Sequence, residues 1–399
     1  MSLTRLLSIT LLLAVTSMAN ASQGKVTLEE LKSLILKQQK QIEDLKSRVK
    51  SNEQKVEATG EILDKSVTNA EVDIPASTPK THVGGYGELH YNNLDSKNEV
   101  DFHRFVLFFD HDFSDKLRLY SELELEHTMS GEGKPGEVEL EQAFIEYDLN
   151  DQQNIKAGVF LMPVGLLNET HEPNTFYGVE RNPVETNIIP TTWSEGGLVF
   201  SGRHASGFSY DIALGSGLSV PTTGGNAYKI RKGRQKVSEA SANSGAITGR
   251  LKWTGWKGVE LAATLVHQND VTQGAGAAGA ESSATLLETH AAIQRGRFGL
   301  RALYASWNLN GAGAKLIGRD RQTGWYIEPS YKFDTKLGMF ARYNEWDNEA
   351  GLNTSSKKKQ TEIGLNYWLH DDVVLKVDYM DQSGNAKDKG FNLGVGYNF

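Results

Sequence analysis

The chain has 399 residues, a formal net charge of −8 and no cysteine. Without cysteine there is no disulfide, no thiolate metal site and no cysteine nucleophile, and the acidic balance argues against nucleic acid as a partner. The mean hydropathy is −0.43, and no apolar run after the N-terminal segment approaches the ~20 residues of a spanning helix. A transmembrane barrel stays open as a fold, because its strands need an apolar residue only at every second position.

The first residues have the pattern of a secretory signal peptide, which we place at residues 1–21. Arg5 supplies the positive start, Leu6 to Val15 form the apolar core, and Ala19-Asn20-Ala21 makes an A-x-A cleavage site. An uncleaved anchor helix is the alternative, but the apolar core is too short to span a membrane. We therefore expect the mature protein to be exported.

Residues 22–63 show a heptad pattern, in which mostly apolar residues between Leu28 and Leu63 recur at steps of three and four, weakened by the polar Gln38, Asn52 and Thr59 at three of these positions. Lys and Glu dominate between them, so the pattern predicts a coiled coil; a lone amphipathic helix lying on another surface is the alternative. At ~1.5 Å per residue such a helix reaches ~50 Å, which suits a periplasmic stalk. The polar, proline-containing residues 64–81 are predicted to be a linker.

From His82 to the C-terminus the hydrophobic period changes to two, which is typical of strands. Each apolar stretch has roughly the 9–11 residues of a tilted membrane strand. The pattern predicts sixteen strands near 82–92, 102–113, 116–127, 138–149, 153–161, 196–204, 207–215, 246–255, 258–268, 284–295, 297–308, 322–333, 336–347, 359–369, 372–382 and 390–399.

The connections between these strands alternate in length. Tight turns such as 114–115 and 370–371 alternate with longer connections such as 93–101, 162–195 and 383–389. This is expected when all short turns lie on one side of a membrane and all long loops on the other, whereas a soluble sandwich or propeller has no reason for it. We predict an all-β transmembrane fold, a 16-stranded antiparallel up-and-down β-barrel over residues 82–399, preceded by the coiled-coil helix.

The last ten residues carry apolar side chains at Phe391, Leu393, Val395, Tyr397 and Phe399, with small or polar residues between them. In water, a terminal strand of this kind would be an exposed adhesive edge unless it paired with the first strand to close a ring. We expect the apolar face to contact lipid and the charged face to line a hydrated lumen.

The connection 162–195 is long, proline-rich and partly apolar, and we expect it to fold into the barrel and narrow it. His171-Glu172 is not a metalloprotease motif, because no second histidine follows four residues on, so His171 is expected to make ordinary hydrogen bonds. The predicted constriction residues are Glu169, His171, Glu172, Arg181 and Glu185.

Alternation along the strands places charged side chains of both signs on the lumen wall. The predicted pore-lining residues are Arg104, Arg118, Glu122, Glu124, Lys156, Arg203, Arg250, Lys252, Arg301, Arg342 and Lys376. The constriction loop adds Glu180 and Glu195 to its other glutamates, against Arg181 alone, which departs from an anion-selective pattern. The basic stretch 229–236 is expected in an external loop, where it attracts anions, binds anionic lipid sugars or is simply solvated.

Several segments together resemble the phosphate-selective porin O and P family. They are FHRFVLFFDHDFSDKLRLYSELELEH, VELEQAFIEYDL, the loop string NETHEPNTFYGVERNPVETNIIPTTW, the heptad segment and the terminal Phe399. The resemblance covers nearly the whole mature chain. It implies a trimer of sixteen-stranded barrels in the outer membrane of a Gram-negative bacterium, each with an in-folded third extracellular loop, and members that favour phosphate line the pore with Arg and Lys.

We therefore predict a passive outer-membrane diffusion channel for small hydrophilic solutes and ions, including anions such as phosphate. A general, cation-preferring or sugar porin and a barrel-anchored periplasmic tether are the alternatives; no G-x-S-x-G or comparable constellation supports an enzyme. Expected partners are a homotrimer, outer-membrane lipid and lipopolysaccharide, a small solute or inorganic anion, and peptidoglycan or a periplasmic protein at the coiled coil. No cofactor and no metal are expected.

Overall fold

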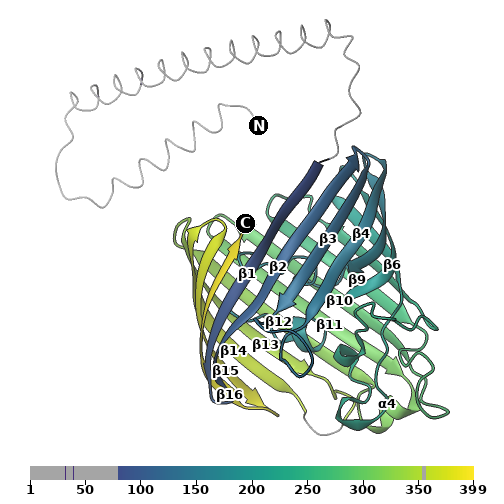
Figure 1. The fold of residues 1–399 in the computed structure, drawn as a ribbon. Coiled ribbons are helices and arrows are strands. Elements are labelled where there is room, and N and C mark those ends of the chain that lie inside the picture. Colours follow the sequence, from purple (N-terminus) through teal and green to yellow (C-terminus); the bar gives the residue numbers. More distant parts are fainter. Residues whose placement is uncertain (1–31, 33–38, 40–79, 353–355) are drawn as a thin grey trace, which may run out of the picture. The chain divides into compact units, whose positions relative to one another are not determined.

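The computed structural model describes residues 80–352 and 356–399, together with Lys32 and Gln39. The predicted signal peptide, the coiled coil apart from these two residues, and almost all of the linker lie outside the described residues. The closed barrel occupies the long C-terminal part (Figure 1).

Sixteen strands follow one another around the ring, and each pairs antiparallel with its neighbours in sequence, as predicted. The observed strand bounds agree with the predicted ones to within about four residues, which is the usual drift of pattern-based boundaries. The strands are β1 (Lys80–Leu94), β2 (Asn98–Ser114), β3 (Leu117–Glu126), β4 (Val138–Asn150), β5 (Gln153–Leu161), β6 (Ser194–Arg203), β7 (Phe208–Gly215), β8 (Ala246–Trp253), β9 (Val259–Gln268), β10 (Ser283–Arg295), β11 (Phe298–Asn310), β12 (Arg321–Lys332), β13 (Leu337–Asp347), β14 (Lys358–His370), β15 (Val373–Gly384) and β16 (Asp388–Asn398).

The ring closes between the first and last strands. β1 pairs antiparallel with β16, from Tyr86 opposite Asn398 to Leu94 opposite Gly390. Beyond this ladder the Gly85 N–H donates to the Phe399 carbonyl at 3.0 Å, and the Phe399 N–H donates back to Gly85 at 2.9 Å. The prediction that the C-terminal strand pairs with the first one is therefore confirmed.

Apolar side chains cover the outside of the barrel at every second position. On β14 to β16 this outer set has exposed fractions of 38–53% and comprises Ile363, Leu365, Tyr367, Leu369, Leu375, Val377, Tyr379, Phe391 and Leu393. The residues between them, such as Lys376, Asp378 and Asn392, point inward and are buried. A polar interior with an apolar exterior is the reverse of a soluble protein and matches a wall that faces lipid.

The predicted strict alternation of short and long connections is wrong at two places. The β1–β2 and β15–β16 connections contain only residues 95–97 and 385–387, whereas the opposite end of the barrel includes connections as long as 254–258. The sequence placed longer loops at 93–101 and 383–389 because polar residues interrupt the apolar pattern there. The backbone nevertheless continues its ladder of hydrogen bonds to Asn93 opposite Asn98.

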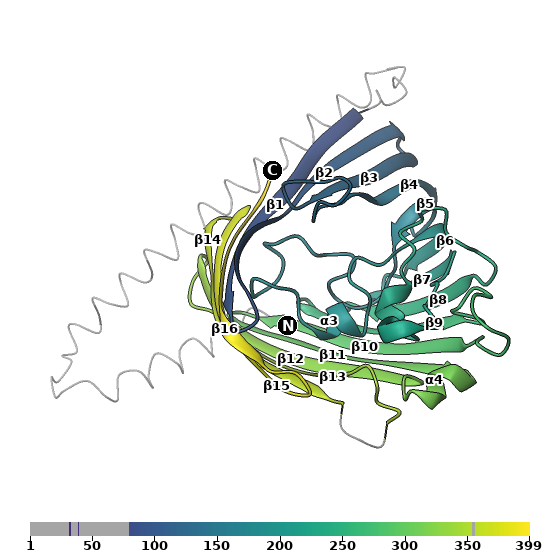
Figure 2. The same cartoon turned by 60° about the horizontal axis from the view of Figure 1, so that its bottom comes forward.

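Two long connections fold into the barrel, and short helices occur within them (Figure 2). α3 (Val184–Asn187) belongs to the loop 162–193, η1 (Gly224–Asn226) and η2 (Ile230–Gly233) belong to the loop 216–245, and α4 (Ala312–Leu316) follows β11. Among the described residues, no helix is long and apolar enough to cross a membrane.

Part of the barrel interior is an apolar core, formed where the in-folded loops pack against the wall, so charged side chains line only part of the interior. From the loop 162–193, Ile188, Ile189 and Trp193 are fully buried and join one cluster with Trp307 and Tyr326 of the wall. The Trp307 indole N–H also donates to the Ile188 carbonyl at 3.0 Å. A ring of sixteen strands is too wide for its own side chains to fill, and the loops supply the missing apolar surface.

We predict that Leu393→Arg, near the middle of β16 on the outer face, destabilises the folded barrel in lipid bilayers by about 2–4 kcal/mol. An arginine near the bilayer midplane has a cost of this order on a barrel wall. Equilibrium unfolding in urea measures it, with Leu393→Ala as the control for lost packing. Equal stability of Leu393→Arg and Leu393→Ala would show that this face does not contact hydrocarbon.

Candidate functional site

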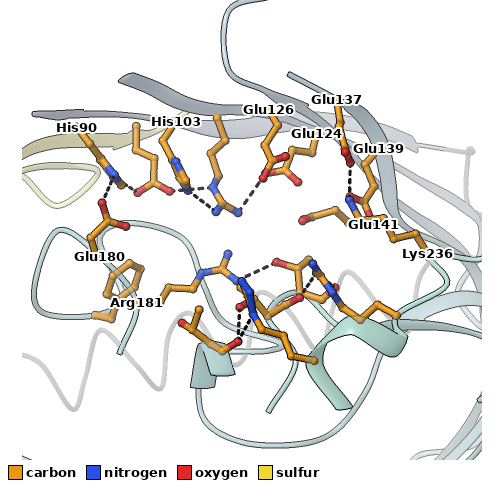
Figure 3. A pocket seen from close by; sticks show the side chains of 18 of the residues that line it. His90, His103, Glu124, Glu126, Glu137, Glu139, Glu141, Glu180, Arg181 and Lys236 are labelled. Atoms are coloured by element: carbon orange, nitrogen blue, oxygen red, sulfur yellow. Dashed lines mark hydrogen bonds and ion pairs between the residues drawn. The ribbon is translucent and has the colours of Figure 1, made fainter. Parts of the chain in front are cut away.

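A cavity of about 380 Å³ inside the barrel separates the wall of β1 to β4 from the two in-folded loops (Figure 3). Its lining is dominated by charged side chains. On the wall side lie Glu88, His90, His103, Arg104, Glu124, Glu126, Glu137, Glu139 and Glu141, and on the loop side lie Glu180, Arg181, Arg231, Arg234 and Lys236.

The wall side is mainly acidic because β3 and β4 present glutamates at alternating positions. Within this wall Arg104 pairs with one glutamate of β1 and one of β3: its Nε lies 2.9 Å from Glu88 and its Nη1 lies 3.1 Å from Glu124. The imidazoles of His90 and His103 stack beside this group, with ring centroids 4.7 Å apart. The wall therefore keeps an excess of carboxylates facing the cavity.

Three arginines from two different loops form the opposite side, and we call them the arginine cluster: Arg181, Arg231 and Arg234. Each is held by the end of the loop 162–193. Arg181 donates to the Thr192 hydroxyl at 2.8 Å, Arg231 donates to the Thr186 carbonyl at 2.5 Å, and Arg234 donates to the Thr191 carbonyl. None of the three forms an ion pair with another residue that the structure describes, so their remaining N–H groups stay available.

Lys236 links the two sides of the cavity. Its ammonium lies 2.7 Å from Glu137 and 2.5 Å from Glu139, at the entrance to β4. Two of the wall carboxylates are therefore already paired with a cation from the loop 216–245.

Glu180 and Arg181 remain oppositely charged neighbours in the loop. Burial acts to raise the pKa of Glu180, but the hydrogen bond and charge of His90, whose Nδ1 lies 3.3 Å away, outweigh it and lower the pKa to about 2. Burial, and after it the nearby Arg104 guanidinium, lower the pKa of Arg181 below its ordinary value. Arginine nevertheless stays protonated in proteins.

Several wall cations hold the loop 162–193 by its backbone. Arg342 donates to the Tyr177 carbonyl at 3.2 Å while pairing with Glu328 and Glu362 at 2.9 and 2.7 Å. Lys376 donates to the Gly178 carbonyl at 2.9 Å, and Arg301 donates to the Thr175 carbonyl at 2.8 Å.

Gly178 is required where this loop approaches the wall. Its φ is +85°, and a Cβ there would lie 2.6 Å from a Glu362 oxygen and 2.9 Å from the Arg342 guanidinium. Any side chain would therefore push the loop away from the cations that hold it.

Glu185 organises the second half of the loop from inside. Its carboxylate accepts the backbone N–H groups of Leu166 and Leu167 at 2.8 and 2.7 Å, and the Tyr326 hydroxyl of β12 at 2.7 Å. Four residues upstream, Arg181 points to the cavity instead. Glu185 is therefore buried and stabilises the loop, and its charge does not face the cavity.

The structure divides the predicted pore-lining residues into groups with different surroundings. Of these, Arg104 and Glu124 line the cavity of Figure 3, while Arg301, Arg342 and Lys376 hold the loop. Arg118, Arg203, Arg250 and Lys252 line another cavity of about 750 Å³ near the short turns, where Lys156 pairs with Glu146, itself in that lining. Arg250 also pairs with Glu169 of the loop. Glu172 is half-buried. Glu122 and His171 lie together on the inner side of β3.

The sequence interpretation missed the arginine cluster's second segment. The stretch 229–236 was expected in an external loop, but Ile230 is fully buried, and Arg231, Arg234 and Lys236 line the cavity. The correction has a physical reason, because Ile230 belongs to the apolar core and Gly233 packs against it, and the arginine that follows each of these two residues lines the cavity. The only local feature of the sequence that indicates this inward position is the spacing of Arg231 and Arg234, each of which directly follows a buried residue.

Comparison with known proteins agrees with this architecture. The profile of the family described as phosphate-selective porin O and P matches residues 82–390. The chain belongs to this family. An uncharacterized protein of Aquifex aeolicus (strain VF5) is 31% identical to it over 353 residues, which cover 78% of this chain and 77% of that protein.

Solved porin structures share the fold at low sequence identity. The anion-selective porin from Comamonas acidovorans superposes with a TM-score of 0.56 at 12% identity, covering 81% of this chain and 100% of that one. The outer membrane channel DcaP of Acinetobacter baumannii gives 0.53 at 13%, covering 81% and 98%, and the trimer form of OmpT from Vibrio cholerae gives 0.54 at 11%, covering 81% and 100%. With the family, this fold identifies an outer-membrane porin channel and points to a channel rather than an enzyme.

We predict that Glu185→Ala in this porin loosens the loop 162–193, which raises single-channel conductance and current noise. Each buried donor left without its partner costs about 1–3 kcal/mol, and four donors lose their acceptor, since the Asn182 amide also donates to Glu185 at 3.2 Å. Planar-bilayer recordings measure the effect, with the exposed Thr170→Ala in the same loop as the control. Wild-type conductance and noise in Glu185→Ala would contradict the role given to this carboxylate.

Proposed function

We propose that this porin is a passive diffusion channel in which the cavity of Figure 3 forms the narrowest part and sorts solutes by charge. The observation that carries the proposal is the separation of charge across the cavity, with glutamates of β3 and β4 on one side and the arginine cluster on the other. Such opposed charges create a transverse field that acts on solutes without any chemical step.

Small anions such as phosphate are the proposed solutes of the arginine side. Guanidinium groups bind oxyanions through paired N–H donors, and three of them converge here from two loops. The loop carboxylates that argued against anions are largely occupied elsewhere: Glu185 and Glu195 are buried and accept hydrogen bonds, and Glu169 pairs with Arg250. This supports an anion path along the arginine cluster.

Cation preference is the second candidate, and the acidic wall favours it. The cavity lining holds seven glutamates against five Arg and Lys residues. If the wall dominates the local potential, cations are enriched at the narrowest point. The two candidates therefore differ in which side of the same cavity sets the ion ratio.

We predict that Arg231→Gln or Arg234→Gln lowers the anion-to-cation permeability ratio by about fivefold. One unit charge at ~4 Å in water is worth about 1 kcal/mol, which corresponds to this factor. Reversal potentials across planar bilayers under a KCl gradient, with and without added phosphate, measure the ratio. Lys232→Gln is the matched control, because it removes the same charge from an exposed position of the same loop.

The phosphate proposal is supported if the wild type prefers anions, if added phosphate reduces this preference by competition, and if the two variants lose it. Cation preference in the wild type, unchanged by phosphate, would remove it in favour of the cation candidate. An equal effect of Lys232→Gln would show that net loop charge, and not the arginine cluster, sets selectivity.

We further propose a homotrimer whose chains are exported by the signal peptide 1–21 and held together on the periplasmic side by the coiled coil 22–63, with outer-membrane lipid and lipopolysaccharide around the barrels. The trimer form of the Vibrio cholerae porin supports the oligomer.

We predict that removing residues 22–63 lowers the temperature at which trimers dissociate, measured by heating series on native gels. An unchanged dissociation temperature would assign the coiled coil to peptidoglycan or a periplasmic partner.

A further inference from the structure

Three potential metal ligands from three separate segments meet on the inner side of the wall formed by β3 and β4. They are Glu122 of β3, Glu141 of β4 and His171 of the loop 162–193, which are 4%, 0% and 3% exposed. The His171 Nε2 lies 3.3 Å from a Glu141 oxygen and 3.6 Å from a Glu122 oxygen. Within the described part of the chain, this is the one group of three such side chains whose ligating atoms all lie within 4.8 Å of one another.

A β-bulge brings the second glutamate into this group. β3 pairs Glu122 with Gln142 and then Leu123 with Leu140, so Glu141 is the extra residue of β4 and has no partner on β3. Glu141 and Gln142 consequently both serve the inner face, and the Gln142 amide donates to the second oxygen of Glu122 at 2.8 Å. Bulges of this kind redirect a side chain and are frequent beside functional sites.

The polar atoms that face one another in this group lack hydrogen-bond partners. Both oxygens of Glu141 and the Nε2 of His171 are buried and have no hydrogen-bond partner among the residues that the structure describes, because the 3.3 Å approach does not have hydrogen-bond geometry. The other imidazole nitrogen, Nδ1, lies 3.1 Å from the Asn168 carbonyl, which can only accept, so Nδ1 is the donor. Metal-ligating histidines are typically oriented by this contact to a backbone carbonyl, which leaves Nε2 free to bind the ion.

We propose that Glu122, Glu141 and His171 bind a divalent transition-metal ion, for which Zn²⁺ is the natural probe. Zinc bonds of about 2.0–2.1 Å in a tetrahedral site place neighbouring ligand atoms about 3.3–3.4 Å apart, close to the two separations observed. An imidazole ligand disfavours Ca²⁺ and Mg²⁺, which take oxygen ligands. Two carboxylates and a neutral imidazole balance the charge of a dication, which removes the penalty of burying them.

The metal has two consequences for the channel. It joins the first half of the loop, through His171, to β3 and β4, whereas the wall cations Arg342 and Lys376 hold the loop further along, at the Tyr177 and Gly178 carbonyls. It also neutralises Glu141, which belongs to the acidic lining. Metal binding itself does not depend on which ion the channel prefers, so it is tested separately from the proposed selectivity.

The full-length protein, purified in detergent without a histidine tag and stripped with EDTA, is titrated with Zn²⁺ by calorimetry. We expect one Zn²⁺ per chain, no binding of Ca²⁺ or Mg²⁺, and affinity lowered more than about tenfold in His171→Gln and in Glu141→Gln. His370→Gln is the matched control, since His370 is an exposed residue at the end of β14. Heat-modifiable migration on gels shows that each variant is still a folded barrel.

Absence of Zn²⁺ binding by the folded wild-type protein would overturn the proposal and would leave a protonated His171 as the buried cation between the two carboxylates. Binding that survives both ligand variants, or that His370→Gln abolishes, would also overturn it by placing the ion elsewhere. Bilayer recordings provide an independent readout. We expect Zn²⁺ to shift the reversal potential of the wild type in the direction of higher anion permeability, and EDTA to reverse this shift. The reversal potential of His171→Gln should not change with Zn²⁺.

Discussion

The structure depends on the closure of a hydrogen-bonded ring in hydrocarbon. No water is present there to satisfy backbone N–H and C=O groups, so each strand must pair on both sides, and β16 must return to β1. This constraint explains why β16, with its apolar face, leaves no exposed edge, since β1 pairs along it. It also reverses the faces of every strand, since the apolar residues must point to lipid.

Closure at sixteen strands produces an interior too wide for wall side chains to fill. The protein fills part of it with the loops 162–193 and 216–245, whose apolar residues form a core against the wall. The charged residues of the wall then have two different roles. Arg342, Lys376 and Arg301 hold loop carbonyls, while the glutamates of β3 and β4 remain facing the cavity.

The cations that face the cavity and have no ion-pair partner among the described residues consequently come from loops rather than from strands. Arg231 and Arg234 are presented by a loop whose own Ile230 lies in the apolar core. The position of the arginine cluster is therefore coupled to the packing of that core. The β-bulge at Glu141 shows the same principle on the wall, because one extra residue in β4 redirects a carboxylate towards the loop.

The sequence by itself determined the number, order and approximate bounds of the strands, the lipid-facing positions and the in-folded loop, because each depends on period-two patterning or on local composition. It placed Arg104 and Glu124 on the lumen wall and Arg181 in the constriction loop, since alternation and loop position decide on which side a residue lies. Only the tertiary structure decided which charges face the cavity. Glu185 is buried and accepts hydrogen bonds from residues up to 141 positions away. The segment 229–236 lies inside the barrel because its Ile230 is part of the apolar core. Such contacts join segments far apart in the chain, and no local period records them.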